Sequence, residues 1–177
     1  MSSASDAGIT SRETLLAHAM AIEAEAVDRF EALADQMEVH NNPEVAAFFR
    51  KMAEIEGKHV ANVEQLRGDA VLPHVAPWDL AWGEDESPEG PLHNDAVHYL
   101  MTPHHAIELA IQSERRAADF FAMVGNDERT PGDVRELAAK LAAEEVEHIR
   151  LLGQWLARYP EPAADWHEDP DPPMLQE

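Results

Sequence analysis

Two pairs of side chains in this sequence have the spacing of metal ligands on a helix. Glu56 and His59 are three residues apart, and Glu145 and His148 repeat this spacing in the second half of the chain. Residues three apart lie on one face of an α-helix, about one turn from each other, so both side chains of a pair can reach a common point. Carboxylate oxygen and imidazole nitrogen together suit iron, manganese or zinc. The two pairs therefore indicate metal binding.

Two further glutamates follow the same pattern. Glu23 and Glu114 each stand seven residues before a phenylalanine, in segments where apolar residues recur with helical period and should face a core. A buried carboxylate without a compensating charge is strongly unfavourable, and two divalent cations carry the four positive charges that four carboxylates require. Neutral imidazoles would add one nitrogen each. We predict no catalytic residue beyond the metal ligands, which are Glu23, Glu56, His59, Glu114, Glu145 and His148.

The acidic residues beside these candidate ligands provide an internal comparison. They fall outside the apolar rows, so we expect them to face solvent. These residues are Glu25, Glu54, Glu144 and Glu147. Helical register therefore separates the predicted ligands from their acidic neighbours.

Four long helices must position the predicted ligands. Hydrophobic period predicts them over residues 11–37, 42–67, 102–124 and 130–159. Asn42 and Thr102 are capping residues, each followed by a proline that needs no amide partner in the first turn of a helix. The low aromatic content, 6%, and the many alanines favour close-packed helices over a sheet. The first and second pairs of helices form an internal repeat, each with a glutamate on one helix and Glu-x-x-His on the next.

The chain is expected to form a single all-α domain. Residues 12–159 would be an antiparallel four-helix bundle of two helical hairpins, joined by a long crossover at residues 68–101. The crossover loses the helical period and contains several prolines, with one short helix expected at residues 94–101. Residues 1–11 would be a flexible N-terminus. The acidic, proline-rich residues 160–177 would form an extended or poorly ordered tail.

Composition excludes several classes of function. The formal net charge is −22, from 35 acidic residues against 13 lysines and arginines, so the surface repels phosphate and we expect no nucleic-acid partner. The chain has no cysteine, which excludes disulfides, thiolate zinc sites and iron–sulfur clusters. It shows no secretory signal and no apolar stretch long enough to span a bilayer. We therefore expect a cytoplasmic protein without a membrane partner.

One glutamate from each of two helices, with Glu-x-x-His from each of the other two, is the ligand arrangement of di-iron and di-manganese carboxylate bundles. Through this pattern, residues 12–159 resemble the rubrerythrin and bacterioferritin branch of the ferritin-like superfamily. The resemblance implies two iron ions, although manganese and zinc also suit the ligand types. It implies that Glu56 and Glu145 bridge the ions, that Glu23 and Glu114 are terminal ligands, and that each ion binds one histidine.

The resemblance also implies an activity. Proteins of this branch oxidise Fe(II) with oxygen or peroxide, or reduce peroxide with electrons from a partner. We therefore expect an oxidoreductase of ferroxidase or peroxidase type, with oxygen or peroxide as its small-molecule oxidant and an external electron donor. Two other functions would use the same site: a metal carrier or iron-loading adaptor without turnover, and a bundle with a purely structural metal.

Four positions depart from the relatives that the chain resembles. Rubrerythrins have a seventh ligand, a glutamate, at the position of Ala117, and bacterioferritins have a haem-binding methionine at the position of Gly57. A tyrosine often stands at the positions of Phe30 and Phe121. Because Gly57 replaces the haem-binding methionine, we expect no haem. The absence of cysteine also excludes a rubredoxin domain.

Further features lie outside this ligand set. Histidines gather in or just after the crossover, where surface or helix-capping roles are favoured over an accessory metal site: His74, His93, His98, His104 and His105. Tryptophans in the loops are expected to cover apolar helix faces or a subunit contact: Trp78, Trp82 and Trp166. A homodimer or higher homo-oligomer is expected, because bundles of this class commonly pair.

Overall fold

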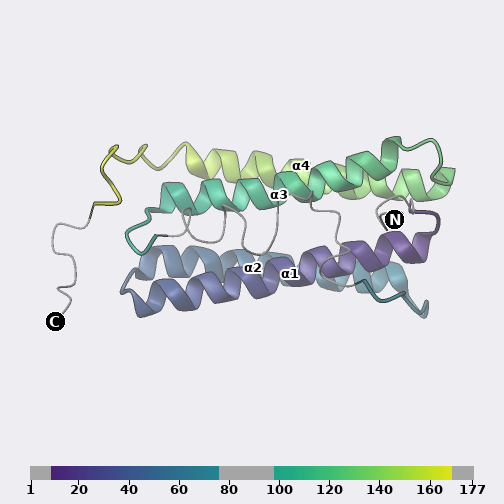
Figure 1. The fold of residues 1–177 in the computed structure, drawn as a ribbon, viewed down its shortest axis with the longest axis horizontal. Helices are drawn as coiled ribbons and strands as arrows, with labels where there is room; N and C mark the ends of the chain where they lie inside the picture. Colours follow the sequence, from purple (N-terminus) through teal and green to yellow (C-terminus); the bar gives the residue numbers. More distant parts are fainter. Residues whose placement is uncertain (1–8, 76–97, 169–177) are drawn as a thin grey trace, which may run out of the picture.

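The computed structural model describes residues 9–75 and 98–168, and four helices account for most of them. They are α1 (Arg12–Val39), α2 (Pro43–Arg67), α3 (Pro103–Asn126) and α4 (Gly132–Leu156). The described ranges contain no strand. Figure 1 shows α1 running beside α2 and α3 beside α4, so that two antiparallel hairpins face each other. The predicted all-α four-helix bundle is confirmed, with helix ends shifted by a few residues.

The helix starts follow from local capping chemistry. Ser11 caps α1, because its hydroxyl accepts a hydrogen bond from the backbone N–H of Thr14 at 3.1 Å. The backbone N–H of Thr102 donates to Nδ1 of His105 at 3.2 Å, which closes the first turn of α3 and gives His105 a capping role. Helix α2 ends at Gly68, whose φ is 58°, a conformation that glycine adopts without steric cost.

Two apolar cores lie at opposite ends of the bundle. The first core, near the α1–α2 turn, includes Phe30, Met37, Phe49, Met101, Ile107 and Leu152. The second core, near the start of α1, includes Leu16, Val63, Phe121, Val134 and Leu141. Each fully buried side chain of this size contributes about 1.5–3 kcal/mol to stability. Each helix passes from one core to the other, so the middle of each helix lies in a layer between them.

The apolar pattern of the sequence favours core positions for Leu66 and Met123, but neither side chain is buried. Leu66 is 40% exposed because it lies in the last turn of α2, at the rim of an open pocket between α2 and α4. Met123 is 56% exposed, while its neighbour Val124 takes the inward position on α3. Of the neighbouring residues Phe48 and Phe49, Phe49 is buried, and Phe48 is half-buried with its ring tilted against that of Phe49.

The segment between the hairpins joins opposite ends of the bundle. Leu72 and Val75 pack against the second core, whereas Met101 belongs to the first core. The expected short helix at residues 94–101 lies partly outside the described residues, and its described part is not helical. Trp78, Trp82 and His93 also lie outside the described residues. None of the helices in the two described ranges is long and apolar enough to cross a membrane.

The described part of the C-terminal tail contacts the bundle through Trp166. This side chain packs against the first core, as expected for a tryptophan that covers an apolar helix face. Its ring centroid lies 3.8 Å from that of His105 and 5.5 Å from that of His98. The start of α3 is therefore covered by residues that follow α4.

Candidate metal centre

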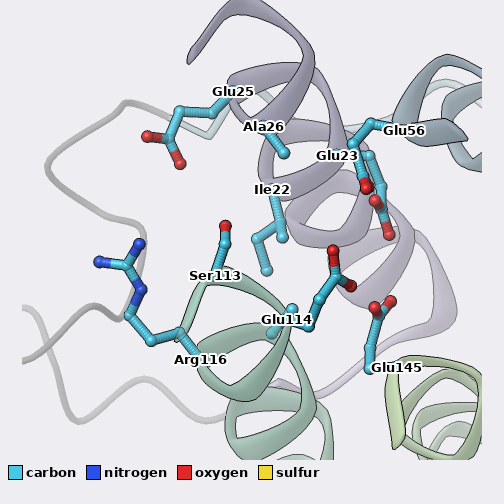
Figure 2. Close-up of a pocket in the computed structure, with 10 residues that line it drawn as sticks. Ile22, Glu23, Glu25, Ala26, Glu56, Ser113, Glu114, Arg116 and Glu145 are labelled. Carbon is cyan, nitrogen blue, oxygen red and sulfur yellow. The ribbon is translucent and has the colours of Figure 1, made fainter. Parts of the chain in front are cut away.

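Four buried carboxylates occupy the layer between the two cores, one from each helix. Their residues are between 2 and 4% exposed: Glu23 on α1, Glu56 on α2, Glu114 on α3 and Glu145 on α4. Figure 2 shows Glu23 and Glu56 opposite Glu114 and Glu145, with the carboxyl groups pointing into the space between the hairpins. Apart from Thr130, they are the only buried polar or charged residues in the described part of the chain.

The first hairpin brings three of the predicted ligands together. Nδ1 of His59 lies 3.1 Å from Oε2 of Glu56 and 3.5 Å from Oε2 of Glu23. One nitrogen or oxygen atom from each of the three residues lies within 4.8 Å of the others. Glu56 and His59 meet because they are one turn apart on α2, and Glu23 reaches them from the middle of α1.

The second hairpin repeats this geometry with its own residues. Nδ1 of His148 lies 3.2 Å from Oε2 of Glu145 and 3.4 Å from Oε2 of Glu114. These three residues again offer nitrogen and oxygen atoms within 4.8 Å of one another. In the described ranges, these two groups are the only clusters of three or more acidic and histidine side chains with such spacing. The internal repeat of the sequence is thus a repeat of side-chain geometry.

The two clusters meet through their histidines. The imidazole rings of His59 and His148 stack with centroids 4.3 Å apart and planes inclined by only 5°. Each ring presents Nδ1 to the carboxylates of its own hairpin. All six residues singled out by the sequence therefore belong to one continuous site.

Burial and the neighbouring charges shift the proton affinities of this site. Burial raises the pKa of Glu23 to about 7 and that of Glu114 to about 9, and nearby carboxylates add to the effect. Burial alone would lower the pKa of His59 and His148, but hydrogen bonds to the carboxylates raise both to about 10. Burial also acts to raise the pKa of Glu145, yet hydrogen bonds with His148 and Glu114 lower it on balance. Protons therefore compensate the carboxylates when no cation does.

One carboxylate oxygen of the site has no hydrogen-bond partner in the metal-free protein. Oε1 of Glu56 is buried and makes no hydrogen bond. Leaving a buried polar atom without a partner costs about 1–3 kcal/mol, and more for a charged group. A cation held by Glu56 would remove this cost. The donor set of carboxylate oxygens and imidazole nitrogens suits iron, manganese or zinc, so the residues present fit a two-metal centre.

Two pockets reach the carboxylates between different pairs of helices. The α1–α3 pocket is lined by Ile22, Glu25, Ala26, Ser113, Arg116, Ala117 and all four buried glutamates. Figure 2 shows Glu25 and Arg116 pointing away from the carboxylates at its rim. The α2–α4 pocket is lined by Glu23, His59, Asn62, Val63, Gln65, Leu66, Leu141, Glu144 and Glu145. Among the described residues, the carboxylates thus border one pocket between α1 and α3 and another between α2 and α4.

The remaining sequence predictions concern neighbouring residues. The acidic residues expected to face solvent do so: Glu25, Glu54, Glu144 and Glu147 are exposed. His74 is also exposed, and Nδ1 of His104 lies 3.3 Å from the backbone oxygen of Tyr159. The described histidines near the crossover form no cluster with metal-ligand spacing.

Several pocket residues were not singled out from the sequence. Ile22 and Ser113 directly precede the glutamates of α1 and α3, and Ala26 follows Glu23 by three residues. Asn62 follows His59 by three residues in the same way. Helical spacing from the ligands was the available signal, because positions three apart share a face. Which of these positions borders a cavity depends on the distance between helices.

Comparison with known proteins agrees with this geometry. A model of the family Rubrerythrin matches residues 14–154. Among solved structures, an uncharacterized conserved protein from Magnetospirillum magnetotacticum MS-1 is similar, with 36% sequence identity and a TM-score of 0.66. The similarity covers 86% of this chain and 98% of that one. No curated protein matches the chain.

Proposed function

Because this chain belongs to the rubrerythrin family, we propose that it is a di-iron oxidoreductase whose six clustered residues bind two iron ions. Its substrates would be a small oxidant, hydrogen peroxide or oxygen, and an external electron donor. The observation that carries this proposal is the layer of four buried carboxylates with two stacked imidazoles between two apolar cores. Two divalent cations would balance the four carboxylates and leave the histidines neutral.

The chemistry that iron supplies is electron transfer. A bound pair of iron ions would supply two electrons by the change from Fe(II) to Fe(III), enough, with two protons, to convert hydrogen peroxide to two water molecules or oxygen to hydrogen peroxide. The chain has no cysteine, so an external donor must return the two electrons. A peroxidase cycle and a ferroxidase reaction share this first step.

The protein residues would fix the geometry of the centre. Glu56 and Glu145 would bridge the two ions, Glu23 and Glu114 would be terminal ligands, and each histidine would bind one ion. The α1–α3 pocket favours a reactive centre over a purely structural metal, because catalytic metal sites keep an accessible position whereas structural sites are closed. The two apolar cores would isolate the site from the ends of the bundle.

A matched pair of variants on α4 tests this function. Glu145→Gln removes a predicted bridging ligand, whereas Glu147→Gln changes an exposed residue two positions further along α4 that lines neither pocket. Protein loaded with Fe(II) without air is mixed with hydrogen peroxide or oxygen, and Fe(III) formation is followed by absorbance. We expect wild type and Glu147→Gln to oxidise two irons per chain faster than free Fe(II), and Glu145→Gln to lose this reaction.

The same experiment separates an enzyme from a carrier. With excess reductant, the proposed oxidoreductase consumes many equivalents of oxidant per site. Oxidation that occurs once per site and stops would favour a metal carrier or adaptor. Oxidation by wild type at the rate of free Fe(II), or full reaction in Glu145→Gln, would refute the proposed function.

A further inference from the structure

We propose that the α2–α4 pocket binds the external electron donor, and that this donor is a small, uncharged aromatic diol of the hydroquinone class. The inference rests on the proposed function and names the class of substrate that returns electrons to the centre. It also assigns a role to four residues outside the ligand set, Asn62, Val63, Gln65 and Leu66.

The α2–α4 pocket is large enough for an organic molecule. Its cavity volume is about 320 Å³, whereas that of the α1–α3 pocket is about 10 Å³, roughly the space of one water molecule. Pockets that bind small organic ligands usually have volumes of about 300–1,000 Å³. Of the two described pockets that border the carboxylates, only the one between α2 and α4 therefore admits a molecule with a six-membered ring.

One of the predicted iron ligands forms part of the pocket wall. His59 lines the pocket, and its side chain is 16% exposed, against 5% for Glu23 and 3% for Glu56, the two carboxylates beside its Nδ1. The ring of His148 stacks on that of His59 and continues the contact into the second hairpin. A molecule held in this pocket would lie against the imidazole of His59. Its electrons would then cross a single side chain to reach an iron ion bound by His59.

The walls of the pocket match the two parts of an aromatic diol. Val63 and Leu141 are buried and Leu66 is exposed, and together they offer an aliphatic surface to a flat ring. Asn62 and Gln65 are exposed and carry amide groups, which both donate and accept hydrogen bonds. The two hydroxyl groups of the diol would bind these amides while the ring packs on the aliphatic side chains.

The charge of the pocket disfavours anionic donors. Glu144 is exposed in the pocket, and none of the described residues that line it is a lysine or an arginine. The net charge of the whole chain is −22. This field repels anions and slows their approach. Nicotinamide and flavin nucleotides, which carry phosphate groups, and ascorbate are therefore disfavoured, whereas a neutral diol is not.

The electrons and protons of the donor step balance. Hydroquinone loses two electrons and two protons and becomes benzoquinone, while two Fe(III) ions take up one electron each and return to Fe(II). The protons pass to solvent through the exposed side of the pocket at Asn62 and Gln65. Reduction of hydrogen peroxide to water consumes two protons. A full cycle therefore converts one hydroquinone and one hydrogen peroxide into one benzoquinone and two water molecules.

Binding of resorcinol tests the pocket without electron transfer. Resorcinol is an isomer of hydroquinone that forms no stable quinone. It is titrated into the metal-free protein while NMR follows the ring signals of His59. We expect these signals to shift with a dissociation constant on the order of 1 mM, because a ligand of this size binds weakly. The absence of a shift at His59 would overturn the proposal.

A charged probe tests the selection for neutral donors. Resorcinol sulfonate has the same ring with one negative charge, and it should bind wild type at least about tenfold more weakly than resorcinol. Glu144→Gln removes the acidic group of the pocket outside the ligand set and should reduce this difference. Equal affinity of wild type for the two probes would overturn the selection by charge.

Leu66→Asn and Met123→Asn are a matched pair of variants. Both residues are exposed apolar side chains, but only Leu66 lines the α2–α4 pocket, and Met123 lines neither described pocket. Because Leu66→Asn removes part of the surface that packs on the ring, we expect resorcinol binding to weaken about fivefold. Met123→Asn should bind like wild type, with the fold of both variants checked by circular dichroism. Equal affinities in the two variants would contradict the assignment of the pocket.

The two half-reactions separate this proposal from the proposed function. Di-iron(III) protein mixed with hydroquinone without air should form one benzoquinone per two irons, measured by its ultraviolet absorbance. Leu66→Asn should slow this reduction about fivefold and leave the oxidation of the Fe(II) protein by hydrogen peroxide at the wild-type rate. Normal oxidation without reduction by hydroquinone, or equal slowing of both half-reactions, would overturn the donor proposal and leave the proposed function intact. Failure of the bound iron to be oxidised would refute the proposed function, while the resorcinol titration would still decide whether the pocket binds an aromatic diol.

Discussion

The four buried glutamates have opposite effects on the metal-free and the metal-bound protein. Without metal they place carboxylates among apolar residues, and Oε1 of Glu56 has no hydrogen-bond partner. A buried charge with incomplete compensation destabilises the folded state. If two ions bind as proposed, the same oxygens would become ligands, and the free energy of binding would add to that of folding.

Substitution of Glu56 should reveal both effects. We predict that Glu56→Gln leaves the metal-free protein at least as stable as wild type, because the amide removes a buried carboxylate whose Oε1 has no partner while its own oxygen can still accept the hydrogen bond from His59. It should also abolish most of the stabilisation that Mn(II) gives to wild type. Melting temperatures with and without Mn(II) measure both quantities.

Glu54→Gln is the matched control on the same helix. Glu54 is exposed and pairs with Lys51, a contact worth at most about 1 kcal/mol. Stabilisation by Mn(II) should therefore persist in this variant. A metal-free Glu56→Gln protein that melts well below wild type would contradict the account.

The shifted proton affinities predict how metal binding depends on pH. In the metal-free protein the pKa is raised to about 7 for Glu23, to about 9 for Glu114 and to about 10 for each of the two histidines. A group with a raised pKa keeps its proton up to a higher pH. Throughout that pH range the proton competes with the cation for the same atom. Metal affinity should therefore rise with pH through the neutral range, with protons released on binding. Calorimetric titration with Mn(II) in buffers of different ionisation enthalpy counts these protons, and affinity independent of pH would disprove this interpretation.

At the scale of elements, Asn42 connects the two hairpins. Its side-chain amide donates hydrogen bonds to the backbone oxygens of Met101, at 2.8 Å, and Tyr99, at 3.3 Å. The sequence predicted Asn42 only as the cap of α2, but its side chain makes no capping hydrogen bond there. It holds the start of α3 against the turn between α1 and α2.

Removing this amide should destabilise the bundle. Asn42→Ala leaves the oxygen of the buried Met101 without its partner, which costs about 1–3 kcal/mol. Chemical denaturation of the metal-free protein measures the loss. Asn126→Ala serves as the control, because the exposed amide of Asn126 donates to the backbone oxygen of Ala122 on the same helix. Its loss of unfolding free energy should be much smaller. Equal losses in the two variants would show that Asn42 does not join the hairpins.

Helical period explains what could be predicted and what could not. Four long helices with apolar rows fix which residues face inward, so glutamates at such positions identified the site without a structure. Leu66 and Met123 both lie near the end of a helix and are exposed, so an apolar residue in the last turns of a helix did not indicate burial here. The α1–α3 pocket was not predictable, because the space beside Ala26 and Ala117 depends on the distance between α1 and α3.

At the scale of the whole molecule, surface composition bears on association. The net charge of −22 opposes close contact between copies, yet Val146 and Leu151 on α4 are 58 and 42% exposed. Burying such apolar side chains against a second copy would be favourable. We predict a homodimer or larger assembly by sedimentation velocity at physiological ionic strength, where salt screens the repulsion. A monomer at micromolar concentration would contradict this prediction.

The central claim is that two metal ions bind between the hairpins on six residues of one chain. Anomalous diffraction from crystals of the protein loaded with Fe(II) or Mn(II) tests it most directly. We expect two peaks per chain in the layer between the apolar cores, one beside His59 and one beside His148, each in contact with carboxylate oxygens of the four buried glutamates. A single ion, ions bound only at the surface, or buried glutamates that contact no metal would contradict it.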